Sequence, residues 1–175
     1  MIKKEIYFYV NSQQKINYEY IKKIGANVII KTDTKPNLGN FIIIKKNCKS
    51  RNIPLFVSNN VQLMFKLGLR NLYLSAFNKR TYKNLPNNIK IIGSAHNKKE
   101  ILEKVSQGCQ RVILSRLFKS KKRGFLGIAK FNLIKGNFSN LIALGGINLN
   151  NYNKLKMLNI KGFASESGLK REFFR

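Results

Sequence analysis

Several features that define common protein classes are scarce or absent in this chain. It has two cysteines, far apart and in no metal-ligand spacing, which argues against a disulfide scaffold and favours a reduced protein of the cytoplasm. No apolar stretch approaches the roughly 20 residues that span a membrane, and the N-terminus has no signal-peptide core. No Pro- or Ser-rich linker divides the 175 residues, so we expect one domain over residues 1–175.

Acidic residues are also scarce, and the charge balance has two explanations. The chain has 34 Lys or Arg against 7 Asp or Glu, a formal net charge of +27. Such a charge suits a polyanionic partner, RNA or a phosphorylated substrate. However, Lys, Asn and Ile make up about two-fifths of the chain and the basic residues are spread along it, which favours compositional drift over a nucleic-acid surface. A hydrophobic content of 43% is enough for a core.

Short apolar runs recur along the whole chain and predict strands. The eight expected strands are 5–10, 27–32, 54–59, 71–76, 90–95, 111–116, 141–146 and 162–167. Several runs are continuous rather than alternating, as in strands buried on both faces. Helical patterns lie between most of them, at 17–24, 38–51, 60–67, 98–107 and 148–158, with another from 128, whereas 77–89 is too short for a full helix. This order predicts an α/β fold, a compact (β/α)8 TIM barrel with shortened helices; an open doubly wound sheet is the alternative.

Local patterns also predict packing. The helix over 98–107 should begin after Asn97, with Glu100 as its capping-box partner. Its expected buried set is Ile101, Leu102 and Val105. The first strand is expected to fill the barrel interior with Tyr7, Phe8 and Tyr9.

In barrels of this kind ligands bind at the C-terminal ends of the strands, and three of these ends are informative. ALGGIN places Gly145 and Gly146 before a predicted helix, where backbone N–H groups and the helix N-terminus would hold a phosphate. GSAH places Ser94 and His96 on one face of an extended segment. The basic loop SRLFKSKKRG supplies a candidate phosphate clamp of Ser120, Lys121, Lys122 and Arg123. The simpler alternatives are a tight turn, a structural histidine and a solvated loop.

With these motifs the sequence resembles the thiamine-phosphate synthase/TenI family, most strongly over 90–167. The family's Gly-x-Ser-x-His segment and following Glu are matched by Gly93, Ser94, His96 and Glu100, with Ser94 displaced by one position. Its phosphate-gripping Gly-Gly-Ile corresponds to Gly145, Gly146 and Ile147, and its last strand to Gly162, Ala164 and Ser167. After strand six, Phe118, Ser120, Arg123 and Gly127 fit the family pattern, with Ser115-Arg116 in place of Gly-Pro.

The resemblance also implies a pyrophosphate site with magnesium as cofactor, and here the sequence departs from the family. The Gln-x-Arg-x-Lys of strand two is reduced to Lys31 and Lys35, and the magnesium-binding Asn-Asp after strand three is replaced by Ser58-Asn59. The loop SAFNKR after strand four has no carboxylate. Magnesium therefore lacks both expected acidic ligands, and we predict no metal residues. The cations available to replace it are Lys31, Lys35, Lys79, Arg80, Lys121, Lys122 and Arg123.

The resemblance implies an enzyme of thiamine biosynthesis, and four hypotheses follow. The first is a synthase that joins a pyrimidine pyrophosphate to a thiazole phosphate and releases pyrophosphate. The second is a TenI-like thiazole tautomerase with His96 as acid/base. The third is a catalytically degenerate phosphate-binding barrel, and the fourth is a charge-driven RNA-binding protein.

The expected site has His96 as its catalytic residue. The substrate- and phosphate-binding residues are expected to be Lys31, Ser94, Ser120, Lys122, Arg123, Gly145, Gly146 and Ser167. We expect a cytoplasmic protein with small phosphorylated substrates as partners and no membrane or nucleic acid, and a homo-oligomer stays open.

Overall fold

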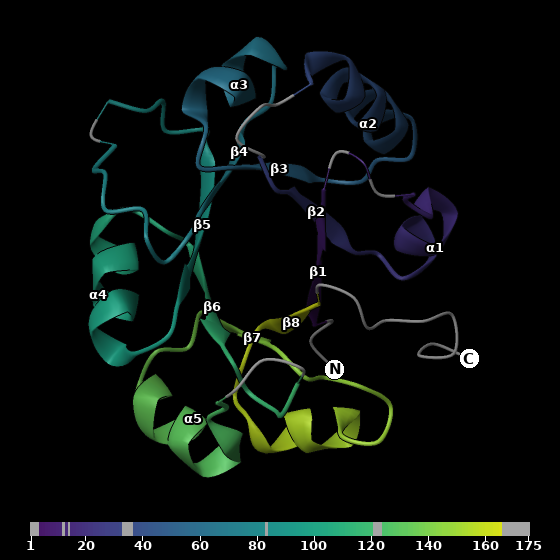
Figure 1. Cartoon of the computed structure of the whole chain (residues 1–175). Coiled ribbons are helices and arrows are strands. Elements are labelled where there is room, and N and C mark those ends of the chain that lie inside the picture. The colour runs from purple at the N-terminus through teal and green to yellow at the C-terminus, as the bar shows by residue number, and fades with distance from the viewer. Residues whose placement is uncertain are drawn as a thin grey trace.

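The computed structural model describes residues 4–11, 13, 15–32, 37–82, 84–120 and 124–165. Eight parallel strands close into a barrel in chain order, so that β1 pairs with both β2 and β8 (Figure 1). The strands are β1 Glu5–Val10, β2 Asn27–Ile30, β3 Leu55–Ser58, β4 Asn71–Leu74, β5 Lys90–Ala95, β6 Arg111–Ser115, β7 Leu141–Leu144 and β8 Gly162–Ser165. The predicted closed barrel is confirmed, and the open sheet is excluded because β8 returns to β1.

Short helices surround the barrel (Figure 1). They are α1 Tyr18–Lys23, α2 Leu38–Ser50, α3 Val61–Lys66, α4 Lys98–Ser106 and α5 Gly127–Lys135. A 3-10 helix, η1 Tyr152–Met157, connects β7 to β8, and the described part of 75–89 connects β4 to β5 without a helix. This shortening is how eight units fit into 175 residues. Within the described ranges, no helix is long and apolar enough to cross a membrane.

Asparagine, which is abundant in this chain, begins four of the helices. The side chains of Asn17, Asn37, Asn60 and Asn97 each accept a backbone N–H from the first turn of α1, α2, α3 and α4. Such caps satisfy donors that a helix leaves unpaired at its start. The abundant asparagines therefore define where these four helices begin.

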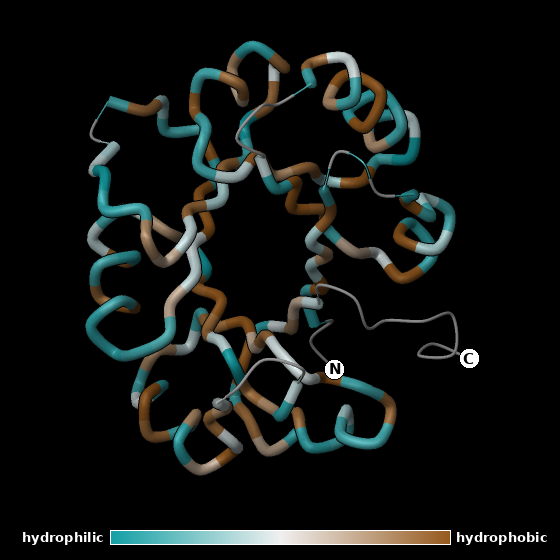
Figure 2. The backbone as a smooth tube through the Cα atoms, in the orientation of Figure 1, coloured by the Kyte–Doolittle hydropathy of each residue, from teal (hydrophilic) through white to brown (hydrophobic). Residues whose placement is uncertain are grey.

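Inward-facing side chains fill the barrel in layers, because alternate residues of a strand point to the same side. One layer comes from the odd-numbered strands and contains Tyr7, Phe56, Ile92 and Ile142. The next comes from the even-numbered strands and contains Ile29, Tyr73, Ile113 and Ala164. Hydrophobic residues accordingly recur along the strands, while the helices carry both hydrophobic and hydrophilic segments (Figure 2). Above these layers Tyr9 projects inward as well, toward the carboxyl ends of the strands.

Two packing predictions were wrong. Phe8 does not fill the interior: it packs against the core between strands and helices, because it alternates with Tyr7 and Tyr9. On α4, Ile101 is buried as expected, but Leu102 and Val105 are about half exposed and Lys104 is fully buried.

The burial of Lys104 depends on a glycine in the neighbouring strand. A Cβ at Gly93 would lie 2.8 Å from Lys104 Cδ, so the missing side chain makes room for the lysine stem. Lys104 Nζ donates to Asn78 O at 2.6 Å and to Gln107 Oε1 at 2.9 Å. Burial lowers the pKa of Lys104, although Cys109 and the nearby carboxylates of Glu103 and Glu100 act in the opposite direction. The lysine thereby connects α4 to the β4–β5 connection.

Candidate active site

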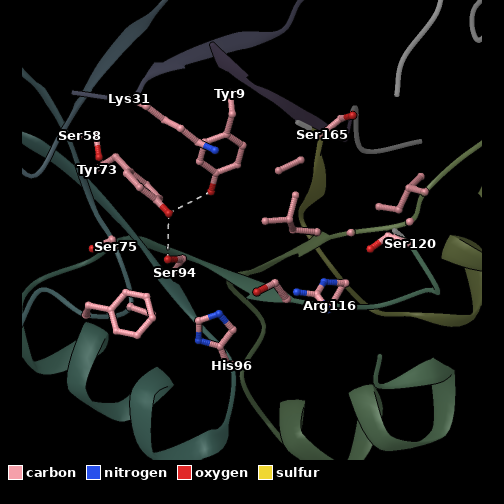
Figure 3. Close-up of a pocket in the computed structure, with 18 of the residues that line it drawn as sticks. Tyr9, Lys31, Ser58, Tyr73, Ser75, Ser94, His96, Arg116, Ser120 and Ser165 are labelled. Atoms are coloured by element: carbon pink, nitrogen blue, oxygen red, sulfur yellow. Dashed lines mark hydrogen bonds between the residues drawn. The ribbon is translucent and has the colours of Figure 1, made fainter. Parts of the chain in front are cut away.

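The carboxyl ends of the strands surround a pocket of about 630 Å³ (Figure 3). Six of the predicted site residues line it together: Lys31, Ser94, His96, Ser120, Gly145 and Gly146. Lys122, Arg123 and Ser167, which were also predicted, lie outside the described residues. Positions far apart in sequence are thus brought to one cavity.

Hydroxyl groups are the commonest polar groups in the lining of this pocket. They come from Thr32, from Tyr9 and Tyr73, and from Ser58, Ser75, Ser94, Ser115, Ser120 and Ser165. Lys31 and Arg116 add positive charge, and no Asp or Glu is among the described lining residues. Hydroxyl donors and fixed cations, without acids to repel it, suit a ligand that carries a phosphate or carboxylate.

His96 stands at the rim of the pocket, just before α4. Its ring Nδ1 lies 3.0 Å from Glu100 Oε2, and its backbone N–H donates to the same oxygen at 2.8 Å. Glu100 N donates to Asn97 Oδ1 at 2.9 Å, and Asn97 Nδ2 donates to Glu100 Oε1 at 3.0 Å. The predicted pairing of Asn97 with Glu100 is present. The Glu100 carboxylate accepts the backbone N–H of His96, one residue before the N-cap residue that a standard capping box would use. The helix cap therefore also fixes the histidine ring.

The same contacts keep Glu100 ionised. Partial burial opposes its charge, but hydrogen bonds from the His96 backbone and ring and from Asn97 outweigh this effect and hold the pKa of the Glu100 carboxyl below its usual value. An ionised Glu100 accepts the proton on Nδ1, so in the neutral ring Nε2 is the nitrogen without a proton. That tautomer is suited to act as a base toward a ligand.

A chain of three hydroxyl groups crosses the floor of the pocket (Figure 3). Tyr9 Oη donates to Tyr73 Oη at 3.1 Å, and Tyr73 Oη donates to Ser94 Oγ at 2.9 Å. The rings of Tyr9 and Tyr73 meet edge to face at 5.5 Å, and Lys31 Nζ lies 5.2 Å from the centre of the Tyr9 ring. Sequence reasoning placed Tyr9 in the core and did not single out Tyr73, because only the strand register shows that the two phenols meet.

Gly145 and Gly146 follow β7, and both have positive φ, 103° and 68°. A Cβ on Gly146 would lie 2.5 Å from the carbonyl oxygens of Phe118 and Lys119, and one on Gly145 would collide with Arg116 Cγ. Leu117 N and Phe118 N donate to Leu144 O and Gly145 O at 2.8 and 3.0 Å. The glycines therefore allow two pocket loops to pack against each other, in addition to facing the cavity.

The helix expected directly after this glycine pair begins later. Only the 3-10 helix η1 follows, from Tyr152, and Asn148 to Asn151 form a turn before it. In that turn Asn148 N donates to Asn151 Oδ1 at 2.8 Å and Asn150 N donates to Asn148 Oδ1 at 3.0 Å. The predicted helix N-terminus at the glycines is thus wrong, since asparagine side chains favour the turn and occupy these donors.

The positions that resemble magnesium ligands do not fit the metal. Asn59 Oδ1 accepts from Ser75 N at 2.9 Å and from Asn78 Nδ2 at 3.1 Å, which uses the oxygen that would have faced an ion. Asn59 Nδ2 donates to Ser75 Oγ at 3.1 Å. These contacts connect the ends of β3 and β4 directly, and they offer no carboxylate of the kind magnesium prefers.

The described carboxylates are also committed elsewhere. Glu5, Glu19, Glu100 and Glu103 pair with Arg111, Arg51, His96 and Lys79 respectively. Among the described residues there is no group of three or more His, Cys, Asp or Glu that could hold a metal ion. Lys79 and Arg80, two of the cations considered for a pyrophosphate, are not among the residues lining the pocket.

A closed parallel barrel with a pocket at the carboxyl ends of its strands defines the class of (β/α)8-barrel proteins. A family model described as thiamine monophosphate synthase (TMP-TENI) matches residues 22–169. The chain belongs to this thiamine monophosphate synthase/TenI family.

A curated relative supports this assignment. The chain is 31% identical over 125 residues to a thiamine-phosphate synthase of Prochlorococcus marinus. The alignment covers 67% of the chain but only 36% of that protein, so the chain matches about a third of the relative's length.

Solved structures share the fold at low sequence identity. A thiamine phosphate pyrophosphorylase from Pyrococcus furiosus superposes with a TM-score of 0.70 at 17% identity, covering 95% of this chain and 87% of that one. A structure described as native KDPGal superposes with a TM-score of 0.63 at 12% identity, covering 95% and 84%. At these identities the likeness concerns the barrel alone.

Proposed function

We propose that this chain binds a thiazole phosphate and moves a proton on it, as a TenI-like tautomerase. The observation that carries this proposal is the histidine at the pocket rim, whose Nδ1 is 3.0 Å from the carboxylate of Glu100. A proton shift needs an oriented acid/base near neutral pH, and it has no pyrophosphate leaving group to stabilise. The replaced acids at the metal-ligand positions are consistent with such a reaction.

Each part of the pocket has a role in this proposal. Nε2 of His96 takes a proton from a ring carbon of the ligand, the electron pair left behind shifts through the conjugated system, and the same proton is returned at a second carbon. Glu100 stabilises the imidazolium that exists between the two transfers. The phosphate is bound by Gly145, Gly146 and Ser120, with Lys31 adding positive charge. Lys122, Arg123 and Ser167 would complete this set.

The synthase is the second candidate, and the comparisons favour it. Both the family description and the Prochlorococcus relative name thiamine-phosphate synthesis. In that reaction the pocket would join a pyrimidine pyrophosphate to a thiazole phosphate and stabilise the departing pyrophosphate with cations such as Lys31 and Arg116. This candidate requires those cations to replace a metal that the donors at Asn59 and Ser75 do not fit.

Two assays on the purified chain separate the candidates. One measures conversion of the thiazole carboxylate phosphate tautomer alone. The other measures pyrophosphate release from pyrimidine pyrophosphate and thiazole phosphate, with and without magnesium. We expect tautomer conversion and no release. Release without conversion would replace the tautomerase with the synthase, and ligand-induced thermal stabilisation without either reaction would indicate a phosphate-binding barrel that has lost catalysis.

A further inference from the structure

The hydroxyl chain on the pocket floor ends at Ser94, a residue that lines the cavity. Ser94 is 7% exposed and lines the pocket, and its Oγ accepts the proton of Tyr73 Oη at 2.9 Å. Tyr73 Oη in turn accepts from Tyr9 Oη at 3.1 Å, so the Tyr73 proton is left for Ser94. No described residue accepts the proton of the Ser94 hydroxyl itself.

A buried hydroxyl with an unused proton has few ways to satisfy it. Leaving a polar group unpaired in the interior costs free energy, so the site favours a ligand that brings an acceptor. A chain of hydrogen bonds also polarises its members, which makes the terminal Ser94 a better donor than an isolated serine. An anionic oxygen is the acceptor that gains most from such a donor.

Ser94 lies close to His96, so an acceptor bound to Ser94 would lie near the proposed reacting centre. Ser94 and His96 are two residues apart at the end of β5, and both line the pocket. Gly145 and Gly146, the proposed phosphate positions, come from the loop after β7. A ligand held by its phosphate at the glycines would meet Ser94 and His96 with its ring.

We propose that Tyr73 is a positioning residue: it holds the Ser94 hydroxyl as a donor to a carboxylate on the ligand's ring and so selects a heteroaromatic phosphate that carries this carboxylate. The inference rests on the proposed function, since it concerns the ligand of the same pocket. It adds a specificity contact at the ring end, formed by Tyr9, Tyr73 and Ser94, to the phosphate contacts at the other end.

The test compares two probes, a thiazole phosphate with a ring carboxylate and the same compound without it. For Tyr73→Phe we expect the affinity for the carboxylated probe to fall roughly tenfold, because one hydrogen bond to a charged group loses its support. Affinity for the other probe should be unchanged. Phe fills the space of the Tyr73 ring, so packing is retained. Tyr7→Phe is the matched control, because Tyr7 lies in the same barrel but its hydroxyl donates to Glu5 at 2.7 Å.

A double-mutant cycle shows whether Tyr73 acts through Ser94. If it does, Tyr73→Phe has no further effect in a Ser94→Ala background. Additive effects, or equal losses for both probes, would overturn the positioning role. If the wild-type chain binds both probes and Tyr73→Phe keeps the wild-type preference for the carboxylated probe, this inference alone would be overturned. A wild-type chain that binds neither probe would overturn the proposed function and the inference with it.

Discussion

The two ends of the barrel use charged residues in different ways. At the amino ends of the strands, Glu5 of β1 accepts from Arg111 of β6 at 2.9 and 2.7 Å and from Tyr7 at 2.7 Å, so the charges are satisfied within the protein. At the carboxyl ends, hydroxyls and cations face the cavity, and the carboxylate of Glu100 fixes a histidine rather than closing the barrel. In this acid-poor chain the charges are paired with one another at one end and face a cavity at the other.

Replacing His96 should have the largest effect, and this effect should be on turnover at the carboxyl ends of the strands rather than on stability. For His96→Ala we expect turnover in the tautomer assay to fall by about 10²-fold or more, because a group that transfers protons is lost. Thermal stability and affinity should change little, since the side chain is about half exposed, at 49%. Initial rates and ligand titrations measure both quantities.

Glu100 provides the companion variant. Glu100→Gln keeps an oxygen that accepts from His96 but removes the charge, so we expect a smaller loss of turnover together with a shifted pH–rate profile. If His96→Ala kept wild-type turnover, the histidine would be structural. The carboxyl ends of the strands would then have no catalytic histidine to contrast with the amino ends.

A glycine of the pocket should affect stability through loop packing. In Gly146→Ala the methyl group would meet the Phe118 and Lys119 carbonyls at 2.5 Å, on a backbone with φ of 68°. We expect a loss of about 1–3 kcal/mol in the free energy of unfolding, measured by denaturant titration, and weaker phosphate binding.

Gly108→Ala separates backbone strain from this collision. Gly108 has φ of 82°, but a Cβ there would meet nothing within 4 Å. Its variant should lose less stability than Gly146→Ala and retain phosphate binding. Equal losses would mean that left-handed backbone strain, and not the contact between the two loops, accounts for the effect.

The barrel could be predicted because its signals are local. Each strand is a short apolar run followed by a turn, and the asparagine caps mark where helices begin. The outward position of Phe8 was also within reach, since strict alternation with Tyr7 and Tyr9 places it on the opposite face. The burial of Lys104 was not, because it depends on the space left by Gly93 in another element.

The location of the candidate site was predictable in part for the same reason. His96, Ser94 and the glycines stand at strand ends, where position alone suggests a ligand. Tyr73 carries no such signal, since a tyrosine within an apolar run usually belongs to the core. The role proposed for Tyr73 depends on its register with Tyr9 and Ser94, and register is a property of the closed barrel rather than of any one segment.

Breaking the hydrogen-bond network of Glu5, Tyr7 and Arg111 at the amino ends of the strands should change stability without changing the pocket. For Glu5→Gln we expect a loss of about 1–2 kcal/mol in the free energy of unfolding, because hydrogen bonds from Arg111 lose their charged acceptor. Glu19→Gln is the control, as the Glu19 side chain is 72% exposed and its pair with Arg51 should contribute little. Ligand affinity should be unchanged in both. A loss of affinity in Glu5→Gln would show that the two ends are coupled.

Acid should remove the difference in stability between wild type and Glu5→Gln, and this is the smallest effect that we expect. Burial opposes the charge of Glu5, but hydrogen bonds from Arg111 and Tyr7 outweigh it and hold the pKa of Glu5 below its ordinary value of 4.5. A carboxyl whose pKa is lower in the folded state contributes stability that is complete above the unfolded pKa and is lost as the pH falls through the folded one. The stability gap between wild type and Glu5→Gln should therefore be constant above about pH 5 and narrow below pH 4.5. Denaturant titrations over this range measure it, and a gap that stays constant into acid would mean that Glu5 contributes by shape rather than by charge.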